Sequence, residues 1–357
     1  MDFQWFKNIV NELKVSIDNK NTEIGTQIIN QGMSPTEVYD LVNNIVEDKL
    51  KVYTSEAKQI FDHRTEDFKK QLLDELKELQ PDEIIKLREP DTQFALREAV
   101  SISGRKHDKD LTNLLARLVI SRIKNDKSGK EELKNIVYNE AISTINRLTI
   151  DQLKIITLCY LIRFTFYPEV NSWESLNDIL ESNMKPFLDF KNTESEFQHI
   201  EYSGCGSLKT GVWKIFDILK NQYTNIFFNL IDSQQIKDLN ITEELKKELF
   251  ELHSNKNKYS FKAKSKELLK KDLDRIGIEE EDERSRHLRN LYNSQIMSNT
   301  EVKILFERKI SIGSKLVDIW ENSSMRHLSL TTVGIAIAIS YFEQLVGEKL
   351  DVDIWIY

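Results

Sequence analysis

Apolar residues recur at spacings of three and four along almost the whole chain, which is the pattern of amphipathic helices. The first such stripe covers residues 3–17. A second begins after Ser34, where a capping serine, a first-turn proline at Pro35 and a glutamate at Glu37 together mark a helix start. From there to Leu79 the helical spacing continues without a glycine or a proline. The N-terminal part of the chain is therefore expected to be helical.

Residues 35–79 allow two arrangements. A single helix of this length would extend about 68 Å, because each residue adds about 1.5 Å, and it would project as an arm. A break near Thr54 or His63 would instead give two helices folded back on each other. The apolar stripe of an arm needs a partner, so the first arrangement predicts a homo-oligomer. The rival expectation is that the stripe packs on the bundle of residues 91–232.

In the rest of the chain the apolar residues also recur at helical spacing, and only the C-terminal end shows the alternation that predicts a strand. In "LDVDIWIY", residues 350–357, three apolar residues alternate with other residues, and this strand is expected to run beside "RHLSL", residues 326–330. With the helix between them, the two strands would form part of a winged-helix-like unit. The expected helices cover residues 91–103, 108–124, 130–147, 150–166, 173–183, 193–203, 207–232, 242–253, 262–276, 283–294, 299–321 and 331–346.

The sequence thus predicts an all-α protein, a multi-helix bundle with a long N-terminal helix and a small two-stranded element at the C-terminus. Only 11 glycines and 5 prolines interrupt the chain, which agrees with long helices and few turns. The proline positions and the spacing of the helices suggest three parts. These are a helical arm over residues 1–80, a central bundle over 81–235, and a C-terminal helical domain with the terminal strand over 236–357.

The net charge of the chain bears on whether it binds nucleic acid or anionic membranes. A net charge of −8 and an isoelectric point near 5.5 give no global attraction to nucleic acid or anionic lipid, so such contact needs a local basic patch. No signal peptide begins the chain, and the weakly polar run of residues 329–342 is shorter than the roughly 20 apolar residues of a membrane-spanning helix. Cys159 and Cys205 provide neither a disulfide framework nor a zinc cluster. We expect a cytoplasmic protein without membrane contact, metal or cofactor.

The segment "EFQHIEYSGCGSLKTGVW", residues 196–213, is the first candidate site. Cys205 is a candidate thiol nucleophile, and His199 lies six residues upstream as its candidate base. Gly204 and Gly206 favour a structural interpretation, because glycines readily take the positive φ angles that end one helix and open the next. We therefore expect Cys205 to be a buried structural residue, and we keep an enzyme built on His199 and Cys205 as the weaker alternative.

The second candidate is a basic stretch, residues 255–271, in which lysines alternate with two aromatic residues. This composition is typical of a nucleic-acid contact. Five consecutive acidic residues, 279–283, follow it closely and are expected to neutralise part of its charge. The candidate nucleic-acid-binding residues are Lys256, Lys258, Tyr259, Lys262, Lys264, Lys266, Lys270 and Lys271.

An ordered series of short motifs resembles an uncharacterised bacterial family whose members are labelled only by locus tags. The series spans most of the chain and has no assigned catalytic residues to carry over. The resemblance implies a genomic neighbourhood of restriction and other anti-phage systems. The motifs are "GMSPTEVYDLV" from Gly32, "DTQFALREA" from Asp91, "SGRKHDKDLTNLLARLVISR" ending at Arg122, "NEA" from Asn139, "LTIDQL" from Leu148, "LIRFT" from Leu161, "QHIEYSGCGS" from Gln198, "LTTVGIAIA" from Leu330 and "IWI" from Ile354.

Two functions from different classes remain. The favoured expectation is a non-enzymatic interaction or sensor protein in bacterial anti-phage defence or stress response, working through a protein partner of a defence system. The alternative is a nucleic-acid-binding regulator that uses the stretch from Lys256 to Lys271. The steep salt dependence of phosphate contacts distinguishes the two.

Overall fold

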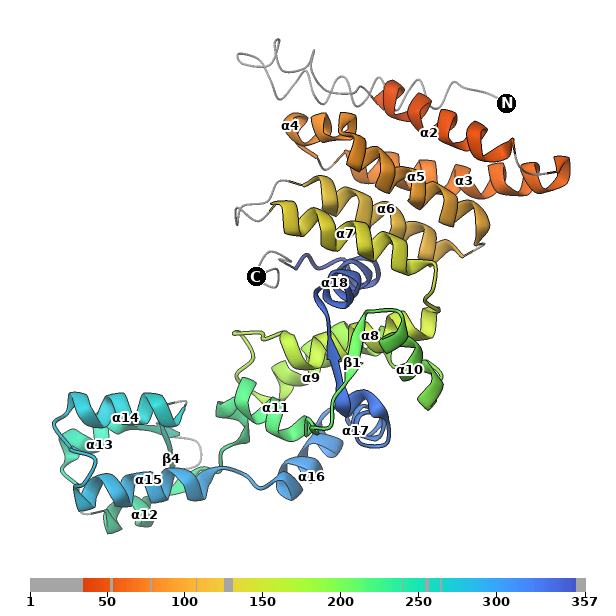
Figure 1. The fold of residues 1–357 in the computed structure, drawn as a ribbon. Coiled ribbons are helices and arrows are strands. Elements are labelled where there is room, and N and C mark those ends of the chain that lie inside the picture. The colour runs from red at the N-terminus through yellow and green to blue at the C-terminus, as the bar shows by residue number, and fades with distance from the viewer. Residues whose placement is uncertain are drawn as a thin grey trace. The chain divides into compact units, whose positions relative to one another are not determined.

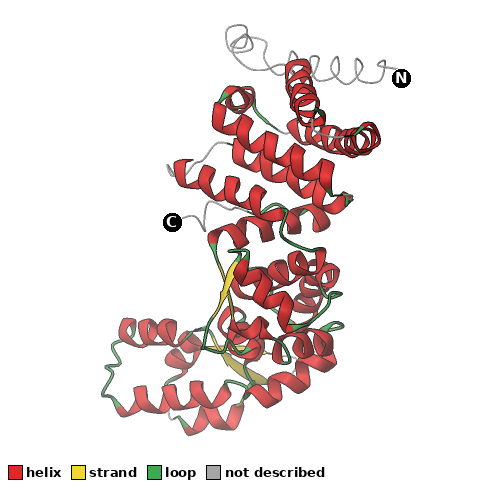
Figure 2. Cartoon of the chain, turned by 45° about the vertical axis from the view of Figure 1, so that its right-hand side comes forward, coloured by secondary structure: helices red, strands yellow, loops and turns green. Residues whose placement is uncertain are grey.

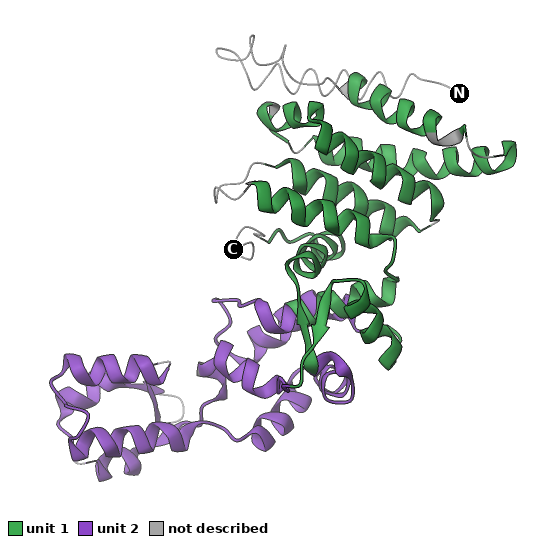
Figure 3. Ribbon diagram, in the orientation of Figure 1, with its two compact units in different colours: residues 1–160, 189–210, 327–357 green, residues 161–188, 211–326 purple. Residues whose placement is uncertain are grey.

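The computed structural model describes residues 35–51, 54–77, 79–106, 108–124, 131–239, 241–253, 257–263 and 265–350. Helices make up most of these residues, with a two-stranded and a three-stranded antiparallel sheet among them, so the predicted all-α class is confirmed (Figure 2). The chain divides into two compact units (Figure 3). Unit 1 comprises Met1–Tyr160, Asp189–Thr210 and His327–Tyr357, and unit 2 comprises Leu161–Leu188 and Gly211–Arg326. The three-part division of the sequence stays a prediction.

Unit 1 begins with α2 (Pro35–Leu50) and α3 (Ser55–Leu76), so residues 35–79 form two helices. The break falls at Thr54, whose side chain accepts a hydrogen bond from the backbone N–H of Ala57 and so begins the second helix. α2 contacts α3 and α5 (Pro90–Arg105), and α3 contacts α5 and α6 (Lys109–Ile123) (Figure 1). The apolar stripe is therefore buried within the chain, as the second of the two arrangements predicted. The expected helix over residues 3–17 lies outside the described residues.

The remaining elements of unit 1 come from distant parts of the sequence. α4 (Pro81–Ile84) and the short η1 (Ile85–Arg88) lead into α5, and α7 (Glu131–Ile145) follows α6. α8 (Ile150–Phe164) begins in unit 1, and α10 (Glu194–Tyr202) follows later. The last helix, α18 (Thr332–Val346), packs on α6 and α7, and its residues 334–342 are buried. This burial confirms that the apolar segment near the C-terminus is a core helix.

A two-stranded sheet connects the middle of the sequence to its end. β1 (Gly206–Leu208) pairs antiparallel with β5 (Leu328–Leu330), with Gly206 opposite Leu330. The other expected partner of β5, residues 351–357, lies outside the described residues. Gly334 in α18 sits directly against this corner, because a Cβ added there would lie 2.0 Å from the carbonyl oxygen of Cys205. The absence of a side chain at Gly334 therefore allows α18 to approach the turn before β1.

Unit 2 contains a helical part and a smaller mixed part. The helical part is α9 (Trp173–Met184), η2 (Lys185–Phe187), α11 (Ile215–Gln222), η3 (Thr224–Phe227), α16 (Asn299–Lys309) and α17 (Gly313–Glu321), with η4 (Ser324–His327) at its end. Phe216 of α11 and Phe306 of α16 pack edge to face with their ring centroids 5.8 Å apart. We call the mixed part, residues 228–297, the hairpin module.

The hairpin module contains β2 (Ile231–Asp232), α12 (Ser233–Asp238), α13 (Glu243–Leu249), β3 (Phe250–His253), β4 (Lys258–Phe261), α14 (Lys266–Arg275) and α15 (Glu283–Gln295). β4 lies in the centre of its antiparallel sheet, in the order β2-β4-β3. The module has its own apolar core, formed by residues from the strands and all four helices. Its buried members are Ile231, Ile236, Leu249, Phe250, Phe261, Ala263, Leu269, Leu273, Ile278, Leu288 and Tyr292.

Three of the helices expected after residue 200 were wrongly predicted. Residues 207–232 contain β1, α11 and β2 in place of one helix, and residues 242–253 leave the helix at Leu249 to form β3. Residues 299–321 are two helices, α16 and α17. In β3 and β4 the alternation of Phe250 with Leu252 and of Tyr259 with Phe261 fits a strand as well as a short piece of helix, and tertiary pairing decides between them.

Candidate functional site

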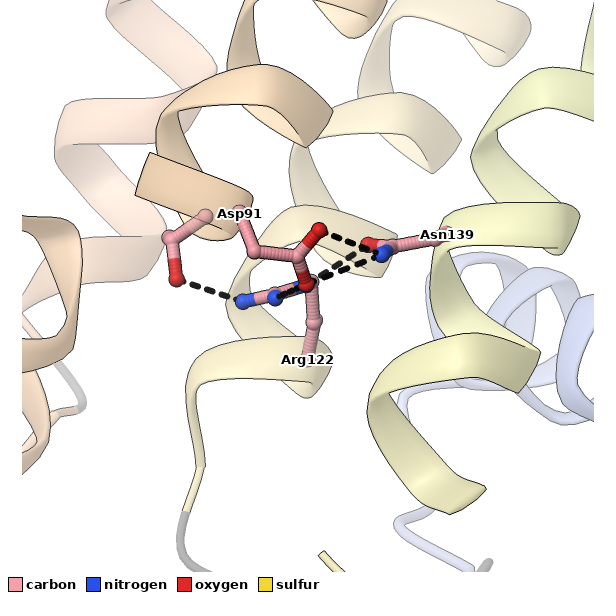
Figure 4. Close-up of polar contacts among 4 residues, drawn as sticks. Asp91, Arg122 and Asn139 are labelled. Carbon is pink, nitrogen blue, oxygen red and sulfur yellow. Dashed lines mark hydrogen bonds and ion pairs between the residues drawn. The ribbon is translucent and has the colours of Figure 1, made fainter. Parts of the chain in front are cut away.

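A buried arginine connects three helices of unit 1 (Figure 4). Arg122, near the end of α6, is 1% exposed, and its Nε donates a hydrogen bond to Oδ1 of Asn139 on α7 at 2.7 Å. Its Nη1 donates to the hydroxyl of Thr92 at 2.5 Å, and its Nη2 forms an ion pair with Asp91, both at the start of α5. The amide of Asn139 donates to the two carboxylate oxygens of Asp91 at 3.2 and 3.0 Å. The four side chains form one closed network.

The charges in this network support a structural role. Hydrogen bonding from Asn139, and then from Arg122, lowers the pKa of Asp91, so the carboxylate stays ionised beside the guanidinium. Each nitrogen of the Arg122 guanidinium already has a partner within the network, and the side chain is almost fully buried, so little of it is accessible to a ligand. We therefore interpret the network as a structural one that holds α5, α6 and α7 together.

The sequence analysis did not single out these residues as a group. Asp91, Arg122 and Asn139 lie in three of the motifs that carry the family resemblance, and this was the one signal that pointed to them. Nothing in the local spacing indicates that an arginine at the end of one helix meets an aspartate at the start of another. That meeting depends on the tertiary packing of α5 on α6.

The structure places Cys205 in a turn between a helix and a strand. Gly204 has a φ of 83° and ends α10, as expected, but Gly206 opens β1 where a second helix was expected. The Cys205 side chain is buried, which confirms its predicted burial, and this burial raises the pKa of the thiol to about 11. The ring of His199 lies near Gln152, with Nδ1 and Oε1 3.2 Å apart. A buried thiol with a raised pKa holds little of the thiolate that nucleophilic catalysis needs.

The hairpin module contains a helix-turn-helix followed by a β-hairpin. Residues 239–242 connect α12 to α13, and Thr242 caps α13 by accepting a hydrogen bond from the backbone N–H of Leu245 at 3.2 Å. α13 runs directly into β3, and β4 returns between β3 and β2. A strand, two helices joined by a short turn and a hairpin in this sheet order are the parts of a winged helix-turn-helix. The structure has this order of elements in residues 231–261, whereas the unit expected around residues 326–357 depends on a strand that lies outside the described residues.

The structure divides the candidate lysines between two elements. Lys258 lies on β4 with Tyr259 and Lys262 directly follows that strand, whereas Lys266, Lys270 and Lys271 lie on α14. Lys256 and Lys264 lie outside the described residues.

Several of these lysines are engaged within the module. Lys258 Nζ lies 3.2 Å from the carboxylate of Asp232, and Lys262 Nζ donates to the carbonyl of Lys247 at 2.6 Å. Lys270 pairs with Glu280 at 2.9 Å, so the acidic stretch does neutralise part of the basic one.

The exposed surface of α13 and the hairpin is mixed in character. Glu243, Glu244 and Lys247 are exposed on α13. Lys246 Nζ lies 5.0 Å from the centre of the Tyr259 ring, and Leu252, opposite Tyr259 in the sheet, is 49% exposed. The surface thus combines an exposed aliphatic side chain, an aromatic ring and charges of both signs.

No group of histidine, cysteine, aspartate and glutamate side chains in the described ranges could hold a metal ion. Within the same ranges, no helix is both long enough and apolar enough to cross a membrane.

The comparisons with known proteins give one match. A family model described only by a locus-tag label with the suffix "-like" matches residues 32–356. No curated protein and no solved structure matches the chain.

Proposed function

The chain belongs to this locus-tag family, and from the geometry of its own residues we propose that it is a regulatory binding protein whose hairpin module contacts a partner protein. In this proposal the helices of unit 1 form a scaffold, and the contact surface is α13 together with the β3–β4 hairpin. The protein performs no chemistry of its own in this role.

One observation carries the choice of a protein partner, namely the composition of that surface. Glu243 and Glu244 are exposed on α13, and their charge is balanced by Lys247 and by Lys246, whose Nζ lies 3.5 Å from the Glu243 carboxylate. This part of α13 therefore presents no net positive charge to the phosphates of a nucleic acid. The exposed Leu252 lies beside the half-buried ring of Tyr259, and apolar surface next to an aromatic ring is typical of the centre of a protein interface. Charged groups of both signs around such a centre favour specificity for one protein.

Nucleic-acid binding is the second candidate, and the helix-turn-helix arrangement itself favours it. In that fold the second helix enters the major groove and the hairpin contacts the backbone. α13 would then be the groove-reading helix, with Lys246, Lys247, Lys258 and Lys262 as phosphate contacts. Lys246, Lys258 and Lys262 already contact Tyr259, Asp232 and the carbonyl of Lys247 respectively, which weakens this candidate.

Capture experiments distinguish the two candidates. Leu252→Ser removes the exposed apolar side chain of the hairpin, and Leu268→Ser is its matched control, because Leu268 on α14 is 45% exposed. Partners are captured from cells with the full chain and with each variant, with and without nuclease. We expect a captured protein that survives nuclease treatment, is lost with Leu252→Ser and is kept with Leu268→Ser.

Salt provides a second readout for the same capture. Protein contacts of this kind should change little between about 50 and 200 mM salt, whereas phosphate contacts weaken steeply over that range. Capture that needs nucleic acid, falls steeply with salt and is lost when Lys258 and Lys262 are changed to glutamine would replace the first candidate with the second.

The cellular role in anti-phage defence rests on the family resemblance alone and is proposed on that basis. Strains with and without the gene are compared for the plating efficiency of a broad panel of phages. A lower plating efficiency in the presence of the gene, lost with Leu252→Ser, is the expected result. Equal plating of every phage would contradict the defence role and would leave the proposed partner contact untouched.

A further inference from the structure

Two adjoining cavities lie beside the first turn of α14, away from α13 and the hairpin. The smaller cavity measures about 250 Å³ and lies between α14 and α15. The larger measures about 560 Å³ and reaches α11 and η3. Both are lined by Lys266, Glu267 and Tyr292, so they meet at these side chains. The larger cavity alone falls within the usual range of small-molecule sites, which is roughly 300–1,000 Å³.

Two buried polar atoms at the smaller cavity have no partner. The hydroxyl of Tyr292 and Nη2 of Arg289 make no hydrogen bond within the part of the chain that the structure describes. Tyr292 is 1% exposed, and its ring is held by Phe228 and Phe261 at centroid distances of 4.8 and 5.1 Å. Burial raises the pKa of Tyr292 to about 12, with a further contribution from the charge of Glu267, so the hydroxyl remains a donor at neutral pH. Unpaired buried polar groups are costly, which makes both atoms candidates for contact with a ligand.

The charges around the smaller cavity favour an anion. Lys266, Lys270 and Arg289 line it against one carboxylate, that of Glu267. Glu280 holds Arg289 by Nη1 at 2.7 Å and Lys270 at 2.9 Å, which orients Arg289 and leaves its Nη2 unbonded. The Arg289 N–H and the Tyr292 hydroxyl can donate to the same small space, which the two lysines also line, and phosphate supplies the matching acceptor oxygens.

The larger cavity could hold the part of a ligand to which the phosphate is attached. Its lining has a balanced charge, with Lys220 and Lys266 against Asp217 and Glu267. The other lining residues offer aromatic and aliphatic surface together with amide and hydroxyl groups, a combination that can hold a heterocycle or a sugar. They are Asn221, Thr224, Phe227, Phe228, Ser265, Tyr292 and Ile296.

We propose that unit 2 binds a small phosphorylated molecule, with its phosphate in the smaller cavity on Arg289, Tyr292 and Lys266 and its remaining part in the larger one, which α11 and η3 also line. The site is separate from the proposed protein contact on α13 and the hairpin, and its test needs no partner. The molecule would therefore act as a ligand of the regulator, with its phosphate held between α14 and α15 of the same module that makes the contact.

Calorimetric titration of the full chain with three probes tests the proposal: inorganic phosphate, adenosine monophosphate and adenosine. Phosphate and the nucleotide should bind, the nucleotide more tightly, and adenosine should bind far more weakly than the nucleotide. Tyr292→Phe removes only the hydroxyl, keeps the buried ring, and should weaken nucleotide binding about tenfold or more, as expected for a hydrogen bond to a charged group.

Two lysine variants complete the test. Lys266→Gln should also weaken binding about tenfold. Lys271→Gln removes the same charge at an exposed position of α14 that lines neither cavity, and should change the affinity by about twofold or less. The proposal is overturned if no phosphate-bearing probe binds, if adenosine binds as tightly as the nucleotide, or if Tyr292→Phe and Lys266→Gln bind like Lys271→Gln.

Discussion

The polar network around Arg122 leads to a prediction about stability, because replacing this one residue removes every hydrogen bond and the ion pair that the guanidinium makes. Arg122→Met keeps a long side chain that can fill the space between α5, α6 and α7 and removes every donor of Arg122. Thr92, which is fully buried, loses its partner, and Asp91 loses its counter-charge. The amide of Asn139 keeps its bonds to Asp91.

The expected loss follows from the exposure of the groups left behind. Removing one member of a buried ion pair typically costs about 3–5 kcal/mol when the remaining charge is itself buried. The side chain of Asp91 is 59% exposed, so water can replace part of what the carboxylate loses. The Thr92 hydroxyl remains buried without a partner, which costs about 1–3 kcal/mol. We therefore expect Arg122→Met to lower the free energy of unfolding by about 2–3 kcal/mol.

Urea unfolding followed by far-ultraviolet circular dichroism measures this loss. The matched control is Arg97→Met, an exposed arginine on α5, which should change the free energy of unfolding by less than about 0.5 kcal/mol. If Arg122→Met unfolds at the same urea concentration as Arg97→Met, the network does not hold the three helices together and the reasoning fails.

Three further predictions concern unit 1. Because the pKa of Asp91 is lowered in the folded state, its contribution to stability should be complete above the unfolded pKa of about 3.9 and disappear as the pH falls through the folded pKa. Urea unfolding between about pH 6 and 3 should therefore show that the free energy of unfolding falls less with acid for Asp91→Asn than for the unchanged chain. Gly334→Ala should lower the melting temperature by several degrees, since its Cβ would lie 2.0 Å from the carbonyl oxygen of Cys205, and an unchanged melting temperature would contradict the close approach of α18. Iodoacetamide should label Cys205 slowly in the folded protein at neutral pH and rapidly in urea, because burial raises the thiol pKa to about 11; rapid labelling of the folded protein would show that the thiol is accessible.

The sequence was most informative where helix signals are local. The break at Thr54 and the burial of residues 334–342 follow from capping chemistry and from an apolar run too long for a surface. The strands could not be found in this way, because β1 pairs with residues more than a hundred positions away in β5. Three-residue and four-residue strands have too few positions for their alternation to differ from one turn of helix.

The candidate sites show the same limit. The burial of Cys205 could be predicted from its two neighbouring glycines, and the partial neutralisation of the lysine stretch from the acids that follow it. The sequence did not indicate that the Tyr292 hydroxyl and Nη2 of Arg289 lack a hydrogen-bond partner among the described residues, since a tyrosine three residues after an arginine on a helix is an ordinary pattern. The Asp91–Arg122 pair likewise depends on the packing of two helices, and no local rule predicts it.

The pairing of β1 with β5 also sets the order in which the protein can be completed on the ribosome. α6 and α7 emerge early, but the helix that covers them, α18, is made near the end of the chain. The residues between β1 and β5 include most of unit 2, and at the usual pace of translation their synthesis takes on the order of ten seconds. During that time unit 2 can fold, while the apolar surfaces of α6 and α7 that α18 later buries remain exposed to solvent. The nascent chain is therefore a natural client for a chaperone, and a premature stop codon before α18 would release a polypeptide with a finished unit 2 and an unfinished, aggregation-prone unit 1.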